Sequence, residues 1–348
     1  MALALQVEFS PPVRYRGGVT GNPELIEAIR REIAAAGGRI TFARFMELAL
    51  YHPQHGYYTT GKHRIGKQGD FFTSVSVGPL FGRILAAQFR KWGATDVLEF
   101  GGHRGQLRAD VLAAAPELNY RVVEVGEALP EQTRNIVFSN EFLDALPVHR
   151  ICGDREVYVV ERASCPLPGE RMAGNGQDAR STVFTEELGE LSDARLPRLP
   201  AGYRSEINLR ALDWLEDVTR RLQSGDYIVT IDYGFERADY FAPHHKDGHL
   251  QCYYRHTKNA DPYRHVGEQD ITAHVEFTSL IERGEQLGLE TVLFTDQTHF
   301  LLQAGEAEIA EIVQRTAGQF SAERNAVHQL LHSTMGHAFK VLVQRKAV

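Results

Sequence analysis

The chain has 348 residues, of which 43% are hydrophobic and 24% are charged, and its formal net charge at pH 7 is −7. This length suits about two domains or one large core with an insertion, and the negative charge gives no field that would gather nucleic acid or anionic lipid. Three scattered cysteines argue against a disulfide framework. No apolar run reaches the roughly 20 residues of a membrane span, and no secretory signal pattern is visible, so we expect a cytoplasmic protein.

The N-terminal part predicts helices and a loop rather than a sheet. Apolar residues at helical spacing predict one helix over 22–36 and a second over 42–51. The glycine- and aromatic-rich segment 56–73, which contains Asp70, is too irregular for a repeating element, and loops of this kind often carry function. We expect residues 1–78 to form a region that packs over an active site.

An α/β core begins with the segment 95–107, in which an apolar strand runs into a glycine turn and the start of a helix. This arrangement is typical of nucleotide sites. Gly101 and Gly105 have no Cβ that would keep a ligand from the backbone, and the next predicted strand ends at Glu124, where an acid could bind a ribose. The pattern indicates an adenosine-type cofactor with Glu99 at its amino group. The alternative is a tight structural turn beside solvated acids.

Only the ten residues 125–134 separate this second strand from the next one, predicted over 135–139. A helical crossover needs roughly a dozen residues or more, so one strand of the usual sheet is expected to be missing. Asn140 and Glu141 then lie at the carboxyl end of a strand, where open α/β sheets bind ligands. If the chain turns helical here, Glu141 and Asp144 share a face and could bind a guanidinium. The alternative is that Asn140 or Asp144 caps a short helix and Glu141 accepts nearby N–H groups.

The second half of the sequence alternates between insertions and core. Short alternating runs at 156–161 and 181–185 predict an inserted hairpin region. A buried strand is predicted over 227–234, and residues 236–269 are expected to form a polar loop. A helix over 272–287 and two closing strands complete the predicted core.

Four polar residues in this half are candidates for substrate binding, namely Arg204, Glu206, Asp232 and His274. Asp232 ends the buried strand and should lie at the same sheet edge as the turn described above. Arg204 and Glu206 could instead pair with each other, and His274 could be a packed or surface histidine. Histidine and cysteine residues between 249 and 256 have a spacing that suggests zinc, but structural zinc normally has four ligands, so no metal is expected.

Several strings occur in an order that resembles one family. They are Gly56-Tyr57-Tyr58, Gly69-Asp70-Phe71, Asn140-Glu141-Phe142, Asp232-Tyr233-Gly234 and the segment 267–277. Together, and over nearly the whole chain, they resemble the MidA family of S-adenosylmethionine-dependent methyltransferases, whose mitochondrial members assist assembly of respiratory complex I.

The resemblance implies an α/β, class I methyltransferase-like (Rossmann-type) sheet with N-terminal helices and an inserted β-rich substrate region. The core would span 79–348, with insertions at about 150–207 and 235–270. S-adenosylmethionine would be the cofactor, and the methyl acceptor a protein nitrogen, arginine in a mitochondrial relative. The candidate partner is a protein, with a respiratory complex I subunit among the candidates.

The resemblance also assigns residues. It implies cofactor binding by Glu99, Gly101, Gly105, Glu124 and Asp70, and it places Asn140, Glu141 and Asp144 beside the methyl-transfer site.

Three features depart from the family pattern. His103 stands where close approach of the backbone to the cofactor is expected, Gly126 replaces a serine, and the segment 125–134 is too short to supply its share of the adenine wall. His103 and the short 125–134 segment favour an alternative in which the chain is a catalytically silent relative that acts as a binding or assembly module. The intact Asn140-Glu141 and 267–274 strings favour the methyltransferase. A nicotinamide-dependent oxidoreductase is a weaker reading, because no pattern for a hydride site is visible.

Overall fold

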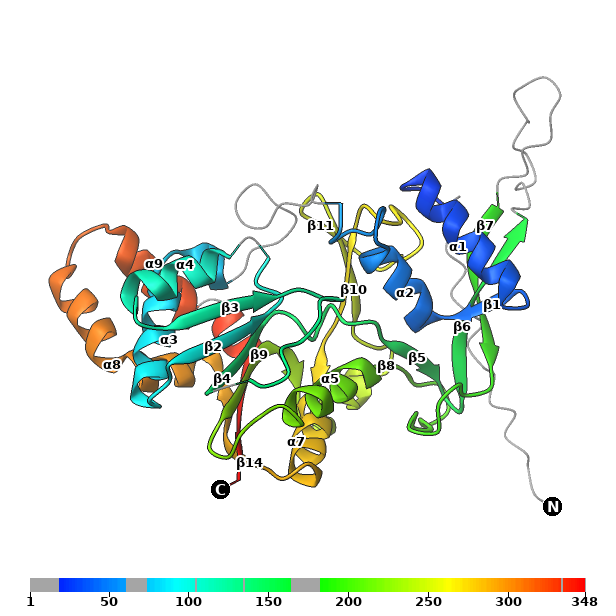
Figure 1. Cartoon of the computed structure of the whole chain (residues 1–348). Coiled ribbons are helices and arrows are strands. Elements are labelled where there is room, and N and C mark those ends of the chain that lie inside the picture. Colours follow the sequence, from blue (N-terminus) through cyan, green and yellow to red (C-terminus); the bar gives the residue numbers. More distant parts are fainter. Residues whose placement is uncertain are drawn as a thin grey trace, which may run out of the picture. The chain divides into compact units, whose positions relative to one another are not determined.

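The computed structural model describes residues 19–60, 74–103, 105–133, 135–163, 182–332 and 334–347. These residues form two compact units (Figure 1). The first unit takes the described parts of 1–64, 147–209 and 243–273, and the second takes those of 65–146, 210–242 and 274–348. Among the described residues, no helix has the length and apolar character needed to cross a bilayer.

The second unit is built on a seven-stranded sheet, in which the path along neighbouring strands is β14-β15-β9-β4-β2-β3 and β13 pairs with β9. The strands are β2 (Asp96–Phe100), β3 (Asn119–Val123), β4 (Ile136–Asn140), β9 (Tyr227–Phe235), β13 (Val275–Glu276), β14 (Leu289–Asp296) and β15 (Phe339–Lys346). The central strands β3, β2, β4 and β9 are parallel, whereas β15 is antiparallel to both of its neighbours. This is the predicted α/β sheet.

The sheet ends at β3. Between Val123 and Ile136 the described residues form turns and bends and contain no strand. The expectation of a missing edge strand is therefore confirmed, and its cause is the short connection, which leaves no room for a helical crossover and another strand.

Helices cover both faces of this sheet (Figure 1). They are α3 (Leu80–Lys91), α4 (Gln106–Ala114), α5 (Leu209–Thr219), α6 (Arg237–Tyr240), α7 (Phe277–Gln286), α8 (Gln297–Arg315), α9 (Ala322–His332) and α10 (Thr334–Ala338). Residues of α3, α4, α8 and α9 pack on one face in a single apolar cluster, and those of α5 and α7 pack on the other. The buried Phe89 of α3 meets Phe138 of β4 edge to face at 5.8 Å, as expected for strands with helices on both sides.

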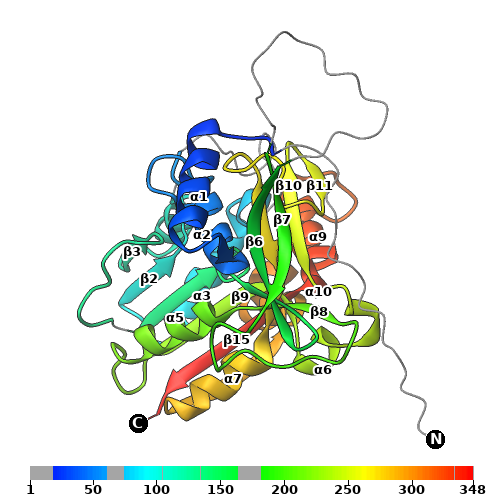
Figure 2. The ribbon, with the colours of Figure 1, turned by 90° about the vertical axis from the view of Figure 1, so that its right-hand side faces the viewer.

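The first unit contains two smaller sheets. Its elements are α1 (Pro23–Ala35), β1 (Arg39–Thr41), α2 (Phe42–Tyr51), β5 (His149–Cys152), β6 (Arg155–Ala163), β7 (Thr182–Gly189), β8 (Arg204–Ile207), β10 (Leu250–Tyr254), β11 (Thr257–Asn259) and β12 (Asp270–Ala273). Strands β6 and β7 form the long antiparallel pair that is prominent in Figure 2. The helices α1 and α2 lie where the sequence predicts them, because Asn22 and Thr41 accept backbone N–H groups at their starts.

Two predictions about this part of the chain are wrong. Residues 236–269 do not form a continuous polar loop, since they include the short helix α6 and the antiparallel pair of β10 and β11. The helix predicted over 272–287 begins at Phe277, because 270–273 pairs with β10 as β12. Glu276 caps this helix by accepting the N–H groups of Thr278 and Ser279.

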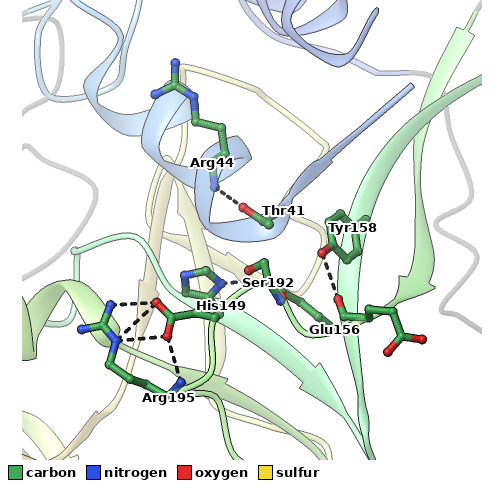
Figure 3. A network of polar contacts seen from close by, with 9 residues as sticks. Thr41, Arg44, His149, Glu156, Tyr158, Ser192 and Arg195 are labelled. Atoms are coloured by element: carbon green, nitrogen blue, oxygen red, sulfur yellow. Dashed lines mark hydrogen bonds and ion pairs between the residues drawn. The ribbon is translucent and has the colours of Figure 1, made fainter. Parts of the chain in front are cut away.

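A buried carboxylate anchors the β5–β6 hairpin (Figure 3). Glu156 is fully buried, lies 2.8 Å from Nδ1 of His149, and accepts the N–H of Ser192 at 2.7 Å. Nearby, Asp193 is paired with Arg195, and this ion pair lowers the pKa of Asp193 to about 2. Through its bond to Ser192, the carboxylate of Glu156 connects the segment after β7 to the β5–β6 hairpin.

Candidate active site

The turn between β2 and α4 has the backbone that the glycine pattern predicts. Gly101 has φ +70° and Gly105, the N-cap of α4, has φ +69°, both in the left-handed region that favours glycine. A Cβ on Gly101 would lie 2.8 Å from Cδ2 of Phe142, whereas a Cβ on Gly105 would have no atom within 4 Å. The turn is therefore packed against the protein at Gly101 and open at Gly105.

Two acids lie beside this turn. Glu99 in β2 is 3% exposed, and burial raises its pKa to about 7, with the charge of Glu124 adding to the increase and the Tyr120 hydroxyl opposing it. Burial also raises the pKa of Glu124, which follows β3. Glu99 Oε2 and Glu124 Oε1 are buried without a hydrogen-bond partner among the described residues.

Buried acceptors without donors are costly unless a ligand supplies the donors. The hydroxyl and amino groups of an adenosyl cofactor are such donors, so this turn and its two acids fit that group. A Cβ on Gly102 would lie 2.7 Å from Glu99 Oε2, which shows how closely the backbone approaches this carboxylate. Asp70, the remaining residue predicted to bind the cofactor, lies outside the described residues.

His103, the main departure in the turn, has φ +48°. Its backbone N–H donates to the carboxylate of Glu124 and lowers the pKa of that group against the effect of burial. The backbone of His103 thus helps to place an acid predicted to bind the ribose.

The segment after β4 carries the predicted catalytic residues. Asn140 ends the strand and Asp144 is buried, while Glu141 has φ +52°, an unusual conformation for a residue with a side chain. Residues 141–146 form bends and turns. The chain therefore does not turn helical here, and the condition under which Glu141 and Asp144 would share a helix face is not met. Both residues lie in the same turn. A strained backbone of this kind typically costs about 1–3 kcal/mol and is found mainly at functional sites.

The carboxylate of Glu141 accepts hydrogen bonds from Ser74 and Asn140. Its Oε1 accepts the backbone N–H of Ser74 at 3.3 Å and the Nδ2 amide of Asn140 at 3.1 Å. The Ser74 hydroxyl donates in turn to Oε1 of Gln297, at 3.0 Å, and both residues are fully buried. The sequence did not point to Ser74 or Gln297. The helix α8, which begins at Gln297, was not predicted. Asp296 could have indicated its start, because its side chain accepts the His299 N–H and caps the helix.

Asp232 of β9 lies beneath the same turn and is fully buried. Its Oδ2 accepts backbone N–H groups from Phe142, Leu143 and Asp144, at 3.2, 2.8 and 3.3 Å, and its Oδ1 accepts the N–H of Tyr233 at 2.9 Å. Burial raises the pKa of Asp232 to about 7, and these donors oppose the increase.

The other predicted substrate residues are distributed over both units. Arg204 and Glu206 belong to the first unit and do not bond to each other, because Arg204 pairs with Glu186 at 3.2 Å and Glu206 pairs with Arg150 at 3.2 Å. Their mutual pairing, the alternative considered above, is therefore wrong. His274 belongs to the second unit and packs against aromatic rings of β9. The structure thus gathers Asn140, Glu141, Asp144 and Asp232 around one turn in the second unit.

The raised pKa of Glu99 predicts a pH effect on stability. The folded protein retains the proton up to about pH 7, whereas an unfolded glutamate ionises near pH 4.3. This group's contribution to stability is complete below pH 4.3 and is lost as the pH rises through about 7. Glu99→Gln should therefore increase the free energy of unfolding of the ligand-free chain by about 2 kcal/mol more at pH 8 than at pH 5.

Denaturant titrations at the two pH values measure this difference. Glu131→Gln is the control, since Glu131 is an exposed acid in the same unit. Equal pH dependence in the two variants would contradict the assignment of a buried, protonated Glu99.

Comparisons with known proteins identify the family of this chain. A profile of the S-adenosyl-L-methionine-dependent methyltransferase family matches residues 119–295. A rat protein named "Protein arginine methyltransferase NDUFAF7, mitochondrial" is 33% identical over 82% of this chain and 76% of its own. The Drosophila melanogaster homologue of the same name is 24% identical over 89% of this chain and 79% of its own.

A solved structure provides the fold comparison. A Burkholderia thailandensis protein bound to S-adenosyl-homocysteine superposes with a TM-score of 0.80 at 30% identity, covering 96% of this chain and 95% of its own. A second structure from that organism superposes with a TM-score of 0.76 at 29% identity.

The comparisons correct the predicted location and do not favour the catalytically silent alternative. The expected cytoplasmic location is wrong, because these animal relatives are named as mitochondrial proteins. The catalytically silent alternative is not favoured, because the relatives are named as methyltransferases. With a family profile over half of its length and a solved relative of the same fold, this chain belongs to the S-adenosyl-L-methionine-dependent methyltransferase family.

Proposed function

We propose that this chain transfers a methyl group from S-adenosylmethionine to an arginine side chain of a protein. The observation that carries the proposal is the strained turn at Glu141. The carboxylate of Glu141 is fixed by Ser74 and Asn140, and Phe142 packs this turn against the glycine turn between β2 and α4. The names of the animal relatives support arginine as the acceptor.

The residues of the glycine turn would bind the cofactor. Glu124 would accept ribose hydroxyl groups and Glu99 an amino group. The support for these roles is that each residue has a buried oxygen without a hydrogen-bond partner in the described part of the chain. When bound, S-adenosylmethionine supplies a methyl group activated by its sulfonium. The open space at Gly105 would let the cofactor lie against the backbone, whereas Gly101 makes room for the ring of Phe142.

The turn after β4 would bind the guanidinium. Glu141 and Asp144 would hold its positive charge and orient one nitrogen, since a carboxylate accepts paired N–H groups from arginine. One of these carboxylates would take up the proton that the nitrogen loses when it is methylated. Much of the rate would come from this orientation and from fixed charges in a site partly closed to water. Because these residues are already held by hydrogen bonds, little reorganisation is required when the substrate binds.

The partner would be a protein with an accessible arginine. A respiratory complex I subunit is the first candidate, as the sequence resemblance implies, and the protein-methyltransferase names of the relatives support a protein acceptor.

Calorimetry followed by methyl-transfer assays tests the proposal. We expect micromolar binding of S-adenosylmethionine and S-adenosylhomocysteine, and transfer of labelled methyl groups to arginine-containing peptides but not to matched peptides with lysine in its place. Mass spectrometry locates the label. Absence of cofactor binding up to millimolar concentration would restore the catalytically silent alternative, and label on lysine alone would contradict arginine as the acceptor.

A further inference from the structure

We infer that Asp232 is a positioning residue for the methyl-transfer site. Its carboxylate would fix the turn that carries Glu141 and Asp144 and would not itself contact the substrate. The inference rests on the proposed function and deepens it, because it assigns the geometry of the acceptor site to a residue beneath it.

The hydrogen bonds of Asp232 carry the inference. One oxygen accepts three consecutive backbone N–H groups, from Phe142 to Asp144, within 3.3 Å, and the other accepts the N–H of Tyr233. Consecutive N–H groups that converge in this way form a concave site for an anion. Because Asp232 is fully buried, no water reaches these donors as a substitute, and both oxygens are already bonded to backbone groups.

The turn needs such an anchor because of its backbone strain. Glu141 holds φ +52°, which an ordinary side chain avoids. Its N–H donates to the carbonyl of Ile231 at 2.9 Å, directly before Asp232, so β9 fixes the turn through both its backbone and this side chain. Without the carboxylate, three buried N–H groups would lose their acceptor, and Glu141 could relax away from the geometry that places its own carboxylate.

The cofactor side of the site has separate support. Phe142 contacts Gly101, and its ring also packs against Phe100 and Trp214, with centroid distances of 5.6 and 5.8 Å. These apolar contacts do not depend on the charge of Asp232. A change at Asp232 should therefore affect methyl transfer more than cofactor affinity.

The chain offers a matched control in Asp226. This buried acid precedes β9 at the opposite end of the strand, and its oxygens accept the backbone N–H groups of Asn135 and Gln223, both at 2.8 Å. It therefore resembles Asp232 in burial and in bonding to backbone donors, but it lies at the amino end of the parallel strands rather than the carboxyl end, where ligands bind.

The experiment compares Asp232→Asn with Asp226→Asn. The amide keeps the shape of the side chain but loses the charge and directs an N–H₂ group at backbone donors. We expect Asp232→Asn to lower kcat at saturating cofactor about 100-fold, with the Kd for S-adenosylhomocysteine within threefold of the wild type. Hydrogen exchange at the amides of 142–144 should accelerate. Asp226→Asn should leave kcat within twofold.

Equal kcat in the two variants, or a loss of kcat that follows a loss of cofactor affinity, would overturn the inference. If Asp232→Asn does not fold, Asp232→Glu serves instead, since it keeps the charge but displaces the oxygens, and wild-type turnover would reject the positioning role. A wild-type chain that binds cofactor but does not methylate arginine contradicts the proposed function alone. In that case the exchange at 142–144 still decides the role of Asp232.

Discussion

Glu141→Gln is expected to lower methyl transfer to arginine by about 100-fold or more, with the affinity for S-adenosylhomocysteine unchanged within threefold. Glutamine can still accept the N–H of Ser74, so the turn should keep its shape. What is lost is the negative charge that would hold the guanidinium, and removal of one such preorganised group from an active site typically costs about 10²–10³ in kcat. Steady-state kinetics with an arginine peptide and calorimetry with S-adenosylhomocysteine measure the two quantities separately.

Glu236→Gln is the matched control for this change. Glu236 also follows the carboxyl end of a core strand, but it is exposed and its side chain makes no capping hydrogen bond to α6. Its replacement should leave turnover within twofold. A fall of less than threefold in the turnover of Glu141→Gln would show that this carboxylate does not act on the acceptor.

Gly101→Ala is expected to weaken S-adenosylhomocysteine binding by about 10- to 100-fold. Alanine at φ +70° is strained by roughly 1–2 kcal/mol, and the new Cβ would lie 2.8 Å from the ring of Phe142. Phe142 is packed against Phe100 and Trp214, so we expect the glycine turn to move rather than the ring. Each factor of ten in affinity corresponds to about 1.4 kcal/mol.

Gly318→Ala separates strain from contact. Gly318 has φ +73°, close to that of Gly101, but a Cβ there would have no atom within 4 Å. Both variants should lose stability through backbone strain, whereas only Gly101→Ala should lose cofactor affinity. Equal affinities in the two variants would place the cofactor away from the glycine turn.

The sequence was sufficient to predict the glycine turn between β2 and α4. An apolar strand, two glycines and a following helix are contiguous in 95–107, and each of these signals acts over a few residues. The missing edge strand could also be predicted, because it follows from the length of one connection.

The position of the turn that carries Glu141 and Asp144 was predictable from the sequence, but its shape was not. Glu141 and Asp144 are three residues apart, and this spacing is the same in a helix and in the turn that the chain adopts. The turn is bonded to Asp232, about 90 residues further along the chain, and the link from Ser74 to Gln297 spans 223 residues. A sequence pattern over a few neighbouring residues cannot predict contacts between residues so far apart in the chain. The strand at 270–273 was missed for a similar reason, because it exists through pairing with β10.

The shortened connection after β3 also bears on self-association. An edge strand exposes backbone groups that can pair with another chain and start aggregation. On β3 the side chain of Arg108 donates to the carbonyl of Tyr120 at 3.1 Å, and Arg121 adds an exposed positive charge. A second molecule that paired with this edge at Tyr120 would have to displace the Arg108 hydrogen bond. The Arg108 hydrogen bond thus disfavours pairing of the exposed β3 edge with a second copy of the chain.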